Sequence, residues 1–344
     1  MSRILVIRLT ALGDVAMTVP VIDALASQYP QHEIVMLSHK QMAPLFSRLP
    51  DNVTFTGADI KGKHHSIFGM NKLFKQLRLM QFDYVADLHK TLRSDVISAR
   101  FRWMGIPVVQ IDKGRMGKYK LTRKKNKIVE RQKDSFKRYA DVFEELGFPL
   151  MLNFTSIYNE GTGDIEKIKQ ITGLKEPESK WIGIAPFAKH NGKIYPIDKM
   201  ETVVAHFAKA AHVKVFLFGG GIKEEAIFAD WKSKYPTLEI MAGRLDLANE
   251  LNLMSHLDVM LSMDSANMHL ASLVNTQVIS IWGQTHPYAG FLGWKQLPVN
   301  IIQVDLPCRP CSVYGNKKCY RKDFACMNQI LPETVIQKVE HCIK

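Results

Sequence analysis

A single carboxylate stands at the turn that ends the first apolar run of the chain. The run Ile4–Ile7 leads into R-L-T-A-L-Gly13-Asp14, and a helix is expected over Val15–Gln28. In a doubly wound α/β domain this turn lies at the carboxyl end of the first strand, where such folds bind ligands. A dinucleotide-binding domain would carry G-x-G-x-x-G here, whereas this turn has one glycine. We therefore interpret Asp14 as a general base rather than as part of a phosphate cradle.

Two lysines follow a second apolar run, Ile182–Pro186. Lys189 and Lys193 lie in a loop at the expected carboxyl end of that strand. Lysine acts on phosphate as a point charge, so this loop could neutralise a diphosphate. The two lysines could equally be ordinary surface residues, and both interpretations stay open.

Three glycines, Gly219, Gly220 and Gly221, end the next apolar run, and Glu224 and Glu225 follow them. Glycines between a strand and a helix let a ligand approach the backbone near the positive end of the helix. The two glutamates could accept hydrogen bonds from ribose hydroxyls, or they could only complement the helix dipole.

The strongest of these signals is M-D-S-A-N-M-H at residues 263–269, where a buried run changes into a helix start. Free N–H groups at such a terminus bind phosphate. Asp264 is expected to be the N-cap, and His269 points either toward the ligand or into the core. Gly283 and Thr285 follow the next run. Because the carboxyl ends of parallel strands meet at one sheet edge, these groups predict a nucleotide or nucleotide-sugar site.

Apolar runs alternate with amphipathic stretches in both halves, which predicts two α/β domains with doubly wound parallel sheets that face each other across a cleft. The charged segment 159–180 is the expected linker. The expected strands are residues 4–7, 33–37, 84–87, 108–111, 181–185, 213–218, 259–262 and 277–282, with 300–304 as an extension, and the clearest helical patterns are 199–210, 223–234 and 247–256.

The chain has 344 residues, of which 46% are hydrophobic, so it can bury two cores. No apolar run is long enough to span a membrane, and no export signal is expected. The formal charge of +13 points to an anionic partner. Residues 113–138 hold twelve Lys/Arg against two acids. This lysine-rich segment is either a solvated face or a surface that meets phosphates or an anionic membrane.

Four cysteines fall in one stretch as C-x2-C-x7-C-x6-C, at Cys308, Cys311, Cys319 and Cys326. Thiolate quartets with a C-x-x-C arm bind zinc or clusters. Structural zinc sites usually have two tight arms, and the second pair here is loose. We therefore expect reduced thiols and no metal, while a structural metal at these four residues stays an alternative.

In this order, the L-G-D turn, the lysine loop, the glycine turn and the D-S-A-N-M-H-L helix start resemble the ADP-heptose:lipopolysaccharide heptosyltransferase family. The stretches D-L-H at 87–89 and L-R-S at 92–94 and the cysteine-bearing tail also match. The resemblance covers nearly the whole chain. It implies an inverting, metal-independent glycosyltransferase of the GT-B fold, with ADP-heptose as donor and an inner-core acceptor of the Kdo–lipid A type.

The resemblance also implies roles for single residues. Asp14 corresponds to the catalytic base. Donor-binding roles fall to Lys189, Lys193, Gly219, Gly220, Glu224, Glu225, Met263, Asp264, Ser265, His269, Gly283 and Thr285. Acceptor-binding roles fall to Thr10, Gly13, His89, Arg93, Lys118, Lys120 and Arg123.

We expect residues 1–165 to form the acceptor domain, 175–330 the donor domain, and 331–344 a C-terminal helix that packs back on the first domain. Ala266 and Tyr195 stand where the family commonly has Gly and Trp, which leaves the identity of the sugar open. The expected protein is a cytoplasmic monomer in peripheral contact with the inner membrane.

Three rival functions remain at this point. A transferase that uses another nucleotide sugar would share all these motifs. A nucleotide-binding protein without turnover would not need Asp14. A nucleic-acid binder would rest on the net charge alone and would leave the strand-end motifs unexplained, so we expect no nucleic-acid partner.

Overall fold

The computed structural model describes residues 1–344, and the chain divides into two compact units. Unit 1 comprises Met1–Lys113 and Lys133–Ile157, and unit 2 comprises Gly114–Gln132 and Tyr158–Lys344. The sequence predicts one uninterrupted first domain over residues 1–165. Instead, most of the lysine-rich segment leaves unit 1 and packs with unit 2, which local sequence patterns do not reveal.

Unit 1 is built on a five-stranded parallel sheet in the order β3-β2-β1-β4-β5. Four of its strands are predicted from the sequence, because strands buried on both faces are continuous apolar runs. The fifth, β3, is half exposed at the sheet edge and its threonines interrupt the apolar pattern, so it is missed. The strands are β1 (Arg3–Ile7), β2 (Glu33–His39), β3 (Val53–Ala58), β4 (Tyr84–Asp87) and β5 (Val108–Gln110).

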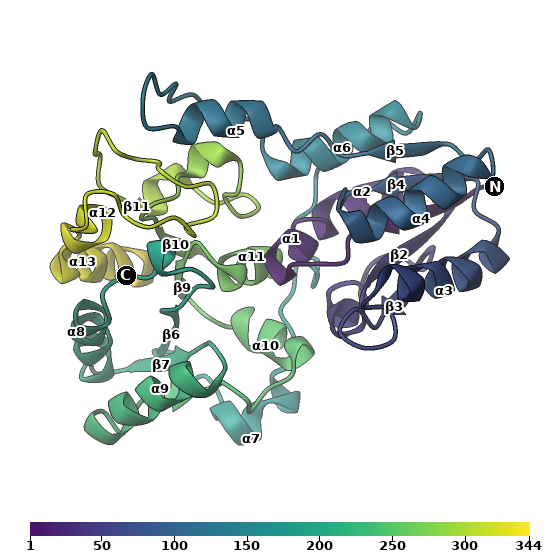
Figure 1. Ribbon diagram of the computed structural model, residues 1–344. Helices are drawn as coiled ribbons and strands as arrows, with labels where there is room; N and C mark the ends of the chain where they lie inside the picture. Colours follow the sequence, from purple (N-terminus) through teal and green to yellow (C-terminus); the bar gives the residue numbers. More distant parts are fainter. The chain divides into compact units, whose positions relative to one another are not determined.

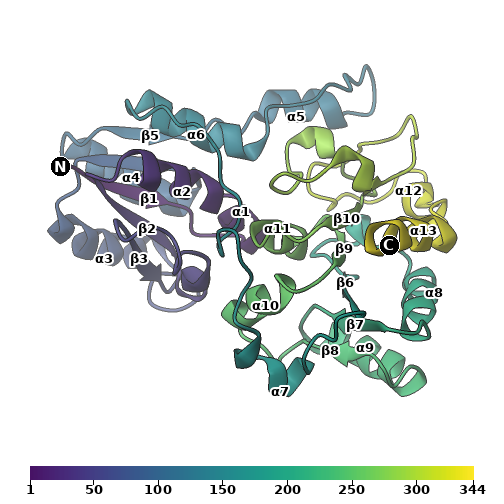
Figure 2. The same cartoon turned by 180° about the vertical axis from the view of Figure 1, so that it is seen from behind.

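Helices cover both faces of this sheet (Figures 1 and 2). Helices α3 (Ile67–Leu77) and α4 (Leu92–Trp103) pack against each other on one face, and α2 (Val19–Gln28) packs against α6 (Ser135–Glu145) on the other. The helix expected over residues 15–28 is divided into α1 (Leu12–Ala16) and α2. The division falls before Pro20, which cannot continue a helix but suits a first turn.

Unit 2 is built on a six-stranded parallel sheet in the order β11-β10-β9-β6-β7-β8. The two-residue strand β8 is the only one that the sequence does not predict, because it is too short to show a period. The strands are β6 (Lys180–Ala185), β7 (Val213–Leu217), β8 (Glu239–Ile240), β9 (Val259–Met263), β10 (Val278–Ile281) and β11 (Ile301–Ile302).

The helices of unit 2 also lie on both faces of the sheet. Helices α8 (Ile197–Ala208), α9 (Ile222–Lys234) and α13 (Pro332–Ile343) share one apolar core, while α10 (Leu247–Met254) and α11 (Ala266–Leu273) pack together on the other face. The C-terminal helix was expected on the first domain. It belongs to unit 2 instead, where α13 buries Val335 and Val339 beside α8 and β9. No helix of the chain is long and apolar enough to cross a membrane.

Candidate active-site residues in the two units

In unit 1, Asp14 lies in the first turn of α1, directly after the carboxyl end of β1. Its Oδ2 lies 2.8 Å from Nη2 of Arg8 and 3.4 Å from the backbone N of Ala11. About a third of the Asp14 side chain is exposed, whereas the Arg8 side chain is buried. The carboxylate is therefore accessible from one side and paired with a cation on the other.

Arg8 is fixed by contacts other than Asp14. Its Nη1 donates to the carbonyl of Leu88 at 2.7 Å, and its guanidinium lies 5.8 Å from the ring centroid of Tyr139. Burial lowers the pKa of Arg8, but its neighbours, with Asp14 supplying both a negative charge and a side-chain hydrogen bond, outweigh this and raise it. Sequence reasoning missed Arg8. The available signal was an arginine directly after a fully apolar strand, where a charge needs a partner.

The carboxyl end of β4 lies beside this pair. Asp87 is fully buried, and it accepts hydrogen bonds from the backbone N of His89 at 2.9 Å and of Lys90 at 2.8 Å. It also accepts from Ser98 Oγ at 3.0 Å and from Gln110 Nε2 at 2.8 Å. All four of these hydrogen bonds hold the turn after β4, so the role of the Asp87 carboxylate is structural.

His89 is held by that turn next to Thr10. Its Nε2 lies 3.5 Å from Thr10 Oγ1, and its Nδ1 lies 3.4 Å from Thr91 Oγ1. Burial, followed by the positive charge of Arg8, lowers the pKa of His89 to about 4. The ring is therefore neutral at neutral pH and can take part in hydrogen bonds to a polar ligand without adding charge.

Of the residues expected to bind the acceptor, two more besides Thr10 and His89 belong to unit 1, and the remaining three belong to unit 2. Gly13 is in α1 and Arg93 is in the first turn of α4. The other three lie on α5 (Arg115–Thr122) of unit 2 or at its end. Lys118 is buried, with its Nζ 4.1 Å from the ring centroid of Phe291, so it presents little charge to solvent. Lys120 is exposed, and Arg123 Nε donates to the carbonyl of Asn126 at 2.6 Å.

In unit 2, an ion pair joins two of the expected donor-site residues. Lys193 ends a short 3₁₀ turn after β6, and its Nζ lies 2.8 Å from Oδ2 of Asp264, which follows β9. The side chains are 15% and 4% exposed, so the pair is largely withdrawn from water. The strand order brings these loops together, because β6 and β9 are neighbours.

Asp264 is not the N-cap of α11, which corrects the sequence expectation. The N-cap is Ser265, in an extended conformation, and its Oγ lies 3.2 Å from Ser262 Oγ. The Asp264 carboxylate is directed to Lys193 instead, because a buried charge is stabilised more by an opposite charge than by a backbone N–H. Met263 and His269 are buried, and Met263 Sδ accepts from the backbone N of Tyr195 at 3.4 Å.

The glycine turn before α9 is closed by its own glutamates. Glu224 Oε2 accepts from the backbone N of Gly220 at 2.9 Å, and Glu225 Oε1 accepts from that of Gly221 at 3.1 Å. A Cβ on Gly219 would lie 2.6 Å from Glu224 Oε2, so a side chain at this position would displace the Glu224 carboxylate. Glu224 is half-buried and Glu225 is exposed, as is Lys189 on the lysine loop.

The loop after β10, which carries Gly283 and Thr285, packs tightly on the lysine loop. The backbone N of Gln284 donates to the carbonyl of Gly192 at 2.9 Å, and a Cβ on Gly283 would lie 2.7 Å from that oxygen. Gln284 and Thr285 are buried. Gly283 is required here because two backbones approach each other closely, a reason that the sequence does not reveal.

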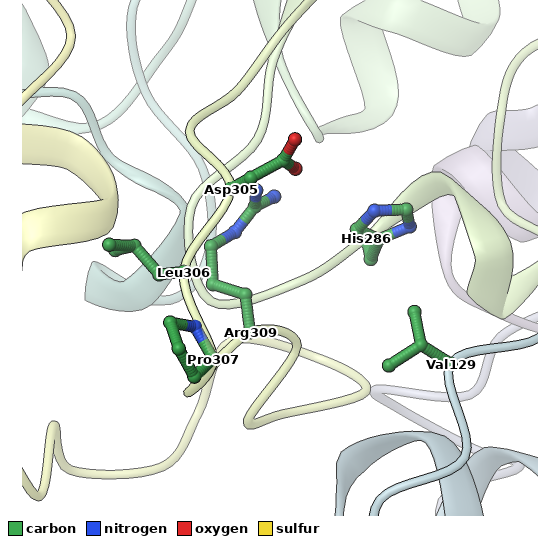
Figure 3. Close-up of a pocket in the computed structure, with 6 residues that line it drawn as sticks. All are labelled: Val129, His286, Asp305, Leu306, Pro307 and Arg309. Atoms are coloured by element: carbon green, nitrogen blue, oxygen red, sulfur yellow. The ribbon is translucent and has the colours of Figure 1, made fainter.

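Arg309 holds the same loop from the cysteine-bearing tail, and sequence reasoning missed it. Its Nε donates to the carbonyl of Gly283 at 2.5 Å, and its Nη2 donates to Thr285 O at 3.0 Å. Arg309 also lines a cavity of about 290 Å³ (Figure 3). Burial, followed by the charge of Arg309, lowers the pKa of His286 in this cavity to about 4. The lining residues are Val129, His286, Asp305, Leu306, Pro307 and Arg309.

Comparison with solved structures identifies the class of fold. The glycosyltransferase of family 9 from Veillonella parvula DSM 2008 matches with a TM-score of 0.74 and 18% identity, over 99% of this chain and 97% of that chain. The two doubly wound units of this chain share the GT-B fold with that structure. The expected fold class is confirmed.

The chain belongs to glycosyltransferase family 9 (heptosyltransferase), whose family model matches residues 70–320. Lipopolysaccharide heptosyltransferase 3 of Escherichia coli K12 is 25% identical over 307 residues, which are 85% of this chain and 84% of that protein. The family resemblance predicted from the motifs is therefore confirmed.

The four clustered cysteines do not form a metal site in this structure. All are free thiols, and no group of three His, Cys, Asp or Glu side chains could hold a metal ion. Burial raises the pKa of Cys326 to about 11. A more distant structural neighbour, TibC of enterotoxigenic E. coli, is an iron-containing dodecameric glycosyltransferase with a TM-score of 0.56 and 13% identity, over 99% of this chain and 76% of that chain.

Proposed function

We propose that this chain transfers a heptose from ADP-heptose to an inner-core acceptor of the Kdo–lipid A type, with inversion at the anomeric carbon and without a metal ion. The family match over residues 70–320 carries the proposal. The geometry of the charged residues described above supports the particular roles that follow.

Asp14 is the proposed general base. The acceptor hydroxyl oxygen attacks the anomeric carbon from the face opposite the diphosphate, the bond to the diphosphate oxygen breaks, and the hydroxyl proton passes to Asp14. Arg8 keeps the carboxylate ionised and in place, which makes it a weak base. A weak base suffices when the proton is lost late, because the hydroxyl becomes acidic as its oxygen bonds to carbon.

Lys193 and the start of α11 are the proposed stabilisers of the leaving ADP. The Lys193 ammonium forms an ion pair with Asp264, and of its three N–H donors this pairing takes at most one. Two donors remain for the diphosphate, whose charge grows as the bond to the sugar breaks. The unpaired N–H groups of the first turn of α11 add positive potential. Charges arranged in this way before the reaction stabilise the transition state without a reorganisation cost.

The remaining donor contacts follow from the strand ends. Glu224, half-buried over Gly219, is the proposed ribose ligand, whereas exposed Glu225 serves the helix terminus. Lys189, Ser265, His269, Gly283 and Thr285 complete the proposed donor site, and Thr10, Gly13, His89 and Arg93 the proposed acceptor site. In this proposal the four clustered cysteines bind no catalytic metal. We further propose that the protein is a monomer that works in the cytoplasm at the inner membrane.

The test is ADP release from ADP-heptose with a panel of Kdo–lipid A acceptors, with and without a chelator, for the wild type and Asp14→Asn. Exposed Asp51→Asn in unit 1 is the matched control. We expect acceptor-dependent release that survives the chelator, that Asp51→Asn retains and that Asp14→Asn loses. The anomeric configuration of the product, read by NMR, tests inversion.

Each other outcome points elsewhere. Release with a different nucleotide sugar only would assign another donor. Binding of ADP-heptose without release for any acceptor would identify a nucleotide-binding protein without turnover. Loss of activity with the chelator, together with metal found in the purified protein, would contradict metal independence.

A further inference from the structure

Helices α3 and α4 of unit 1 expose large apolar side chains on their outer sides. Phe68 is 86% exposed and Trp103 is 85% exposed. Leu92 at the start of α4 and Leu79, two residues after the end of α3, are similarly exposed. The two helices lie side by side on one face of the sheet (Figures 1 and 2). Scattered apolar residues need no explanation, but a set on two neighbouring helices does.

The exposed apolar residues of α4 fall on one stripe. Leu92, Val96, Ala99 and Trp103 are separated by four, three and four positions, which places them on the same side of a helix. Leu92, Ala99 and Trp103 are exposed, whereas Val96 is half-buried and packs against the core of unit 1. The opposite side carries residues such as Ile97 and Phe101, which are buried in the core of unit 1. An exposed Leu and Trp on the side of α4 that faces away from the core form a narrow apolar stripe beside arginines, and such a stripe is available to a second apolar environment.

The outer side of α3 repeats this spacing with mixed chemistry. Phe68, Lys72, Lys75 and Leu79 are again separated by four, three and four positions, and all four are exposed. The inner side buries Met70, Leu73, Phe74 and Leu77. Lysines between two apolar ends can extend along the surface and keep their ammonium groups in a polar layer while the apolar groups insert.

The charge on these helices is mostly positive. Residues 60–82 include four lysines and one arginine and no Asp or Glu. Helix α4 adds exposed Arg100 and Arg102, and its one acid, Asp95, accepts a hydrogen bond from Gln110 Nε2 at 2.7 Å. Such a surface repels a second copy of itself and complements an anionic one.

We propose that this outer surface docks unit 1 on a bilayer that contains anionic lipids. We call it the α3–α4 face and define it by Phe68, Lys72, Lys75, Leu79, Leu92 and Trp103. Phe68 and Trp103 insert at the depth of the headgroups, where aromatic side chains are favoured, and the lysines and arginines meet lipid phosphates. The inference rests on the proposed function, because a lipid acceptor requires the enzyme at a membrane. It assigns the contact to the α3–α4 face rather than to the lysine-rich segment.

The test is flotation of the full chain with vesicles of phosphatidylethanolamine and phosphatidylglycerol, and with phosphatidylcholine vesicles, at physiological salt. The test variant is Phe68→Ser/Trp103→Ser. The matched control is Leu297→Ser/Val299→Ser, which removes two exposed apolar residues of unit 2. We expect the wild type and the control to float with the anionic vesicles only, and the test variant to bind at least about tenfold more weakly.

Trp103 provides a second readout, because it is the exposed one of the five tryptophans: Trp181, Trp231 and Trp282 are buried and Trp294 is half-buried, so the Trp103 signal is the difference between the wild type and Trp103→Phe. On vesicle binding we expect a blue shift of the emission and quenching by brominated lipid, both absent in Trp103→Phe. Equal binding of the test variant and the wild type would overturn the proposal, as would an unshifted Trp103. A test variant that loses self-association in ultracentrifugation would show instead that the face is buried between copies.

The two proposals fail separately. With acceptor dispersed in detergent, the test variant should release ADP at the wild-type rate, since it needs no bilayer there. If the wild type releases no ADP under any condition but still floats with anionic vesicles and shows the Trp103 emission shift, the proposed function is wrong and the proposal for the α3–α4 face is supported. Unchanged thermal unfolding of the test variant, expected from the exposure of both residues, excludes misfolding.

Discussion

Arg8 Nη2 lies 2.8 Å from Asp14 Oδ2, so the carboxylate at the end of β1 is one half of an ion pair. The two residues are not equivalent. Arg8 is buried and has further partners in Leu88 and Tyr139, whereas Asp14 is partly exposed. Arg8 is thus a fixed support, and Asp14 is the member that a ligand can reach. In the proposed mechanism Arg8 positions the base and holds its charge without touching the substrate.

This arrangement predicts different results for the two members of the pair. Asp14→Asn should lower kcat by about a thousandfold, because no group is left to take the proton. Arg8→Met should leave residual activity and move the acidic limb of the pH profile of kcat/KM to higher pH by about one unit, since a carboxylate without its cation holds a proton more tightly. The measurement is the rate of ADP release between pH 5 and 9.

The control for this pair is donor affinity by calorimetry, which neither change should affect. A profile of Arg8→Met that keeps the wild-type limb would mean that Arg8 only stabilises the fold. Wild-type turnover by Asp14→Asn would remove Asp14 from the mechanism.

The pair Lys193–Asp264 predicts an effect on activity that can be separated from its effect on stability. Lys193→Met should lower kcat by about a hundredfold or more, because a donor to the leaving diphosphate is lost. It should also lower the free energy of unfolding by about 3 kcal/mol, because it leaves the 4% exposed carboxylate of Asp264 without its cation. Lys193→Met/Asp264→Asn should recover stability but not activity.

Chemical denaturation and single-turnover ADP release measure these two effects. Lys189→Met is the matched control for stability only, because Lys189 is an exposed lysine of the same loop that belongs to the proposed donor site but should change stability little. Recovery of activity in the double variant would show that the lysine serves the fold alone.

The sequence predicted the sheets better than the contacts between side chains. Strands such as β4 and β6 are continuous apolar runs, and such runs are an adequate signal for buried parallel strands. The edge strands β3 and β8 were missed because they are partly polar or two residues long. The residues at the strand ends could be found because an α/β sheet places ligands there.

Pairing was the part that the sequence could not provide. Nothing local to Arg8 or Arg309 says which oxygen each guanidinium meets, because their partners lie up to 80 positions away along the chain. The same limit explains the error at Asp264, where a residue suited to an N-cap binds a distant lysine. It also explains why residues 114–132 were assigned to the first domain, since packing of that segment depends on residues such as Phe291 and Tyr288.

His89 predicts a loss of stability in acid. Burial and then Arg8 lower its pKa to about 4, compared with about 6.5 in the unfolded chain. The unfolded state therefore binds more protons between these values, so the free energy of unfolding is unaffected above pH 6.5 and falls as the pH drops toward 4. The expected maximum loss from this residue is about 3 kcal/mol.

Urea denaturation at a series of pH values measures this slope. His89→Asn should flatten it, because the variant has no ring to protonate, while His341→Asn, a change at an exposed histidine of α13, should leave it unchanged. An equal slope in His89→Asn and the wild type would assign the acid sensitivity to other groups, of which buried His286 is the first candidate.

Arg309 predicts that the cysteine-bearing tail supports the donor site through hydrogen bonds. Its guanidinium donates to the carbonyls of Gly283 and Thr285 and to those of Trp282 and Val304. A lysine keeps the charge but lacks the planar set of donors, so Arg309→Lys should leave buried carbonyls unpaired and cost about 3 kcal/mol of unfolding free energy. Because the loop at 283–285 would then be free to shift, the affinity for ADP should fall about tenfold.

Arg321→Lys, which alters an exposed arginine of the same tail paired with Asp323, is the matched control and should change neither quantity. Calorimetric ADP binding and chemical denaturation of both variants decide the question. A variant that loses stability but binds ADP normally would show that Arg309 serves the fold and that the donor loop is positioned by Gly192 and Gly315 instead.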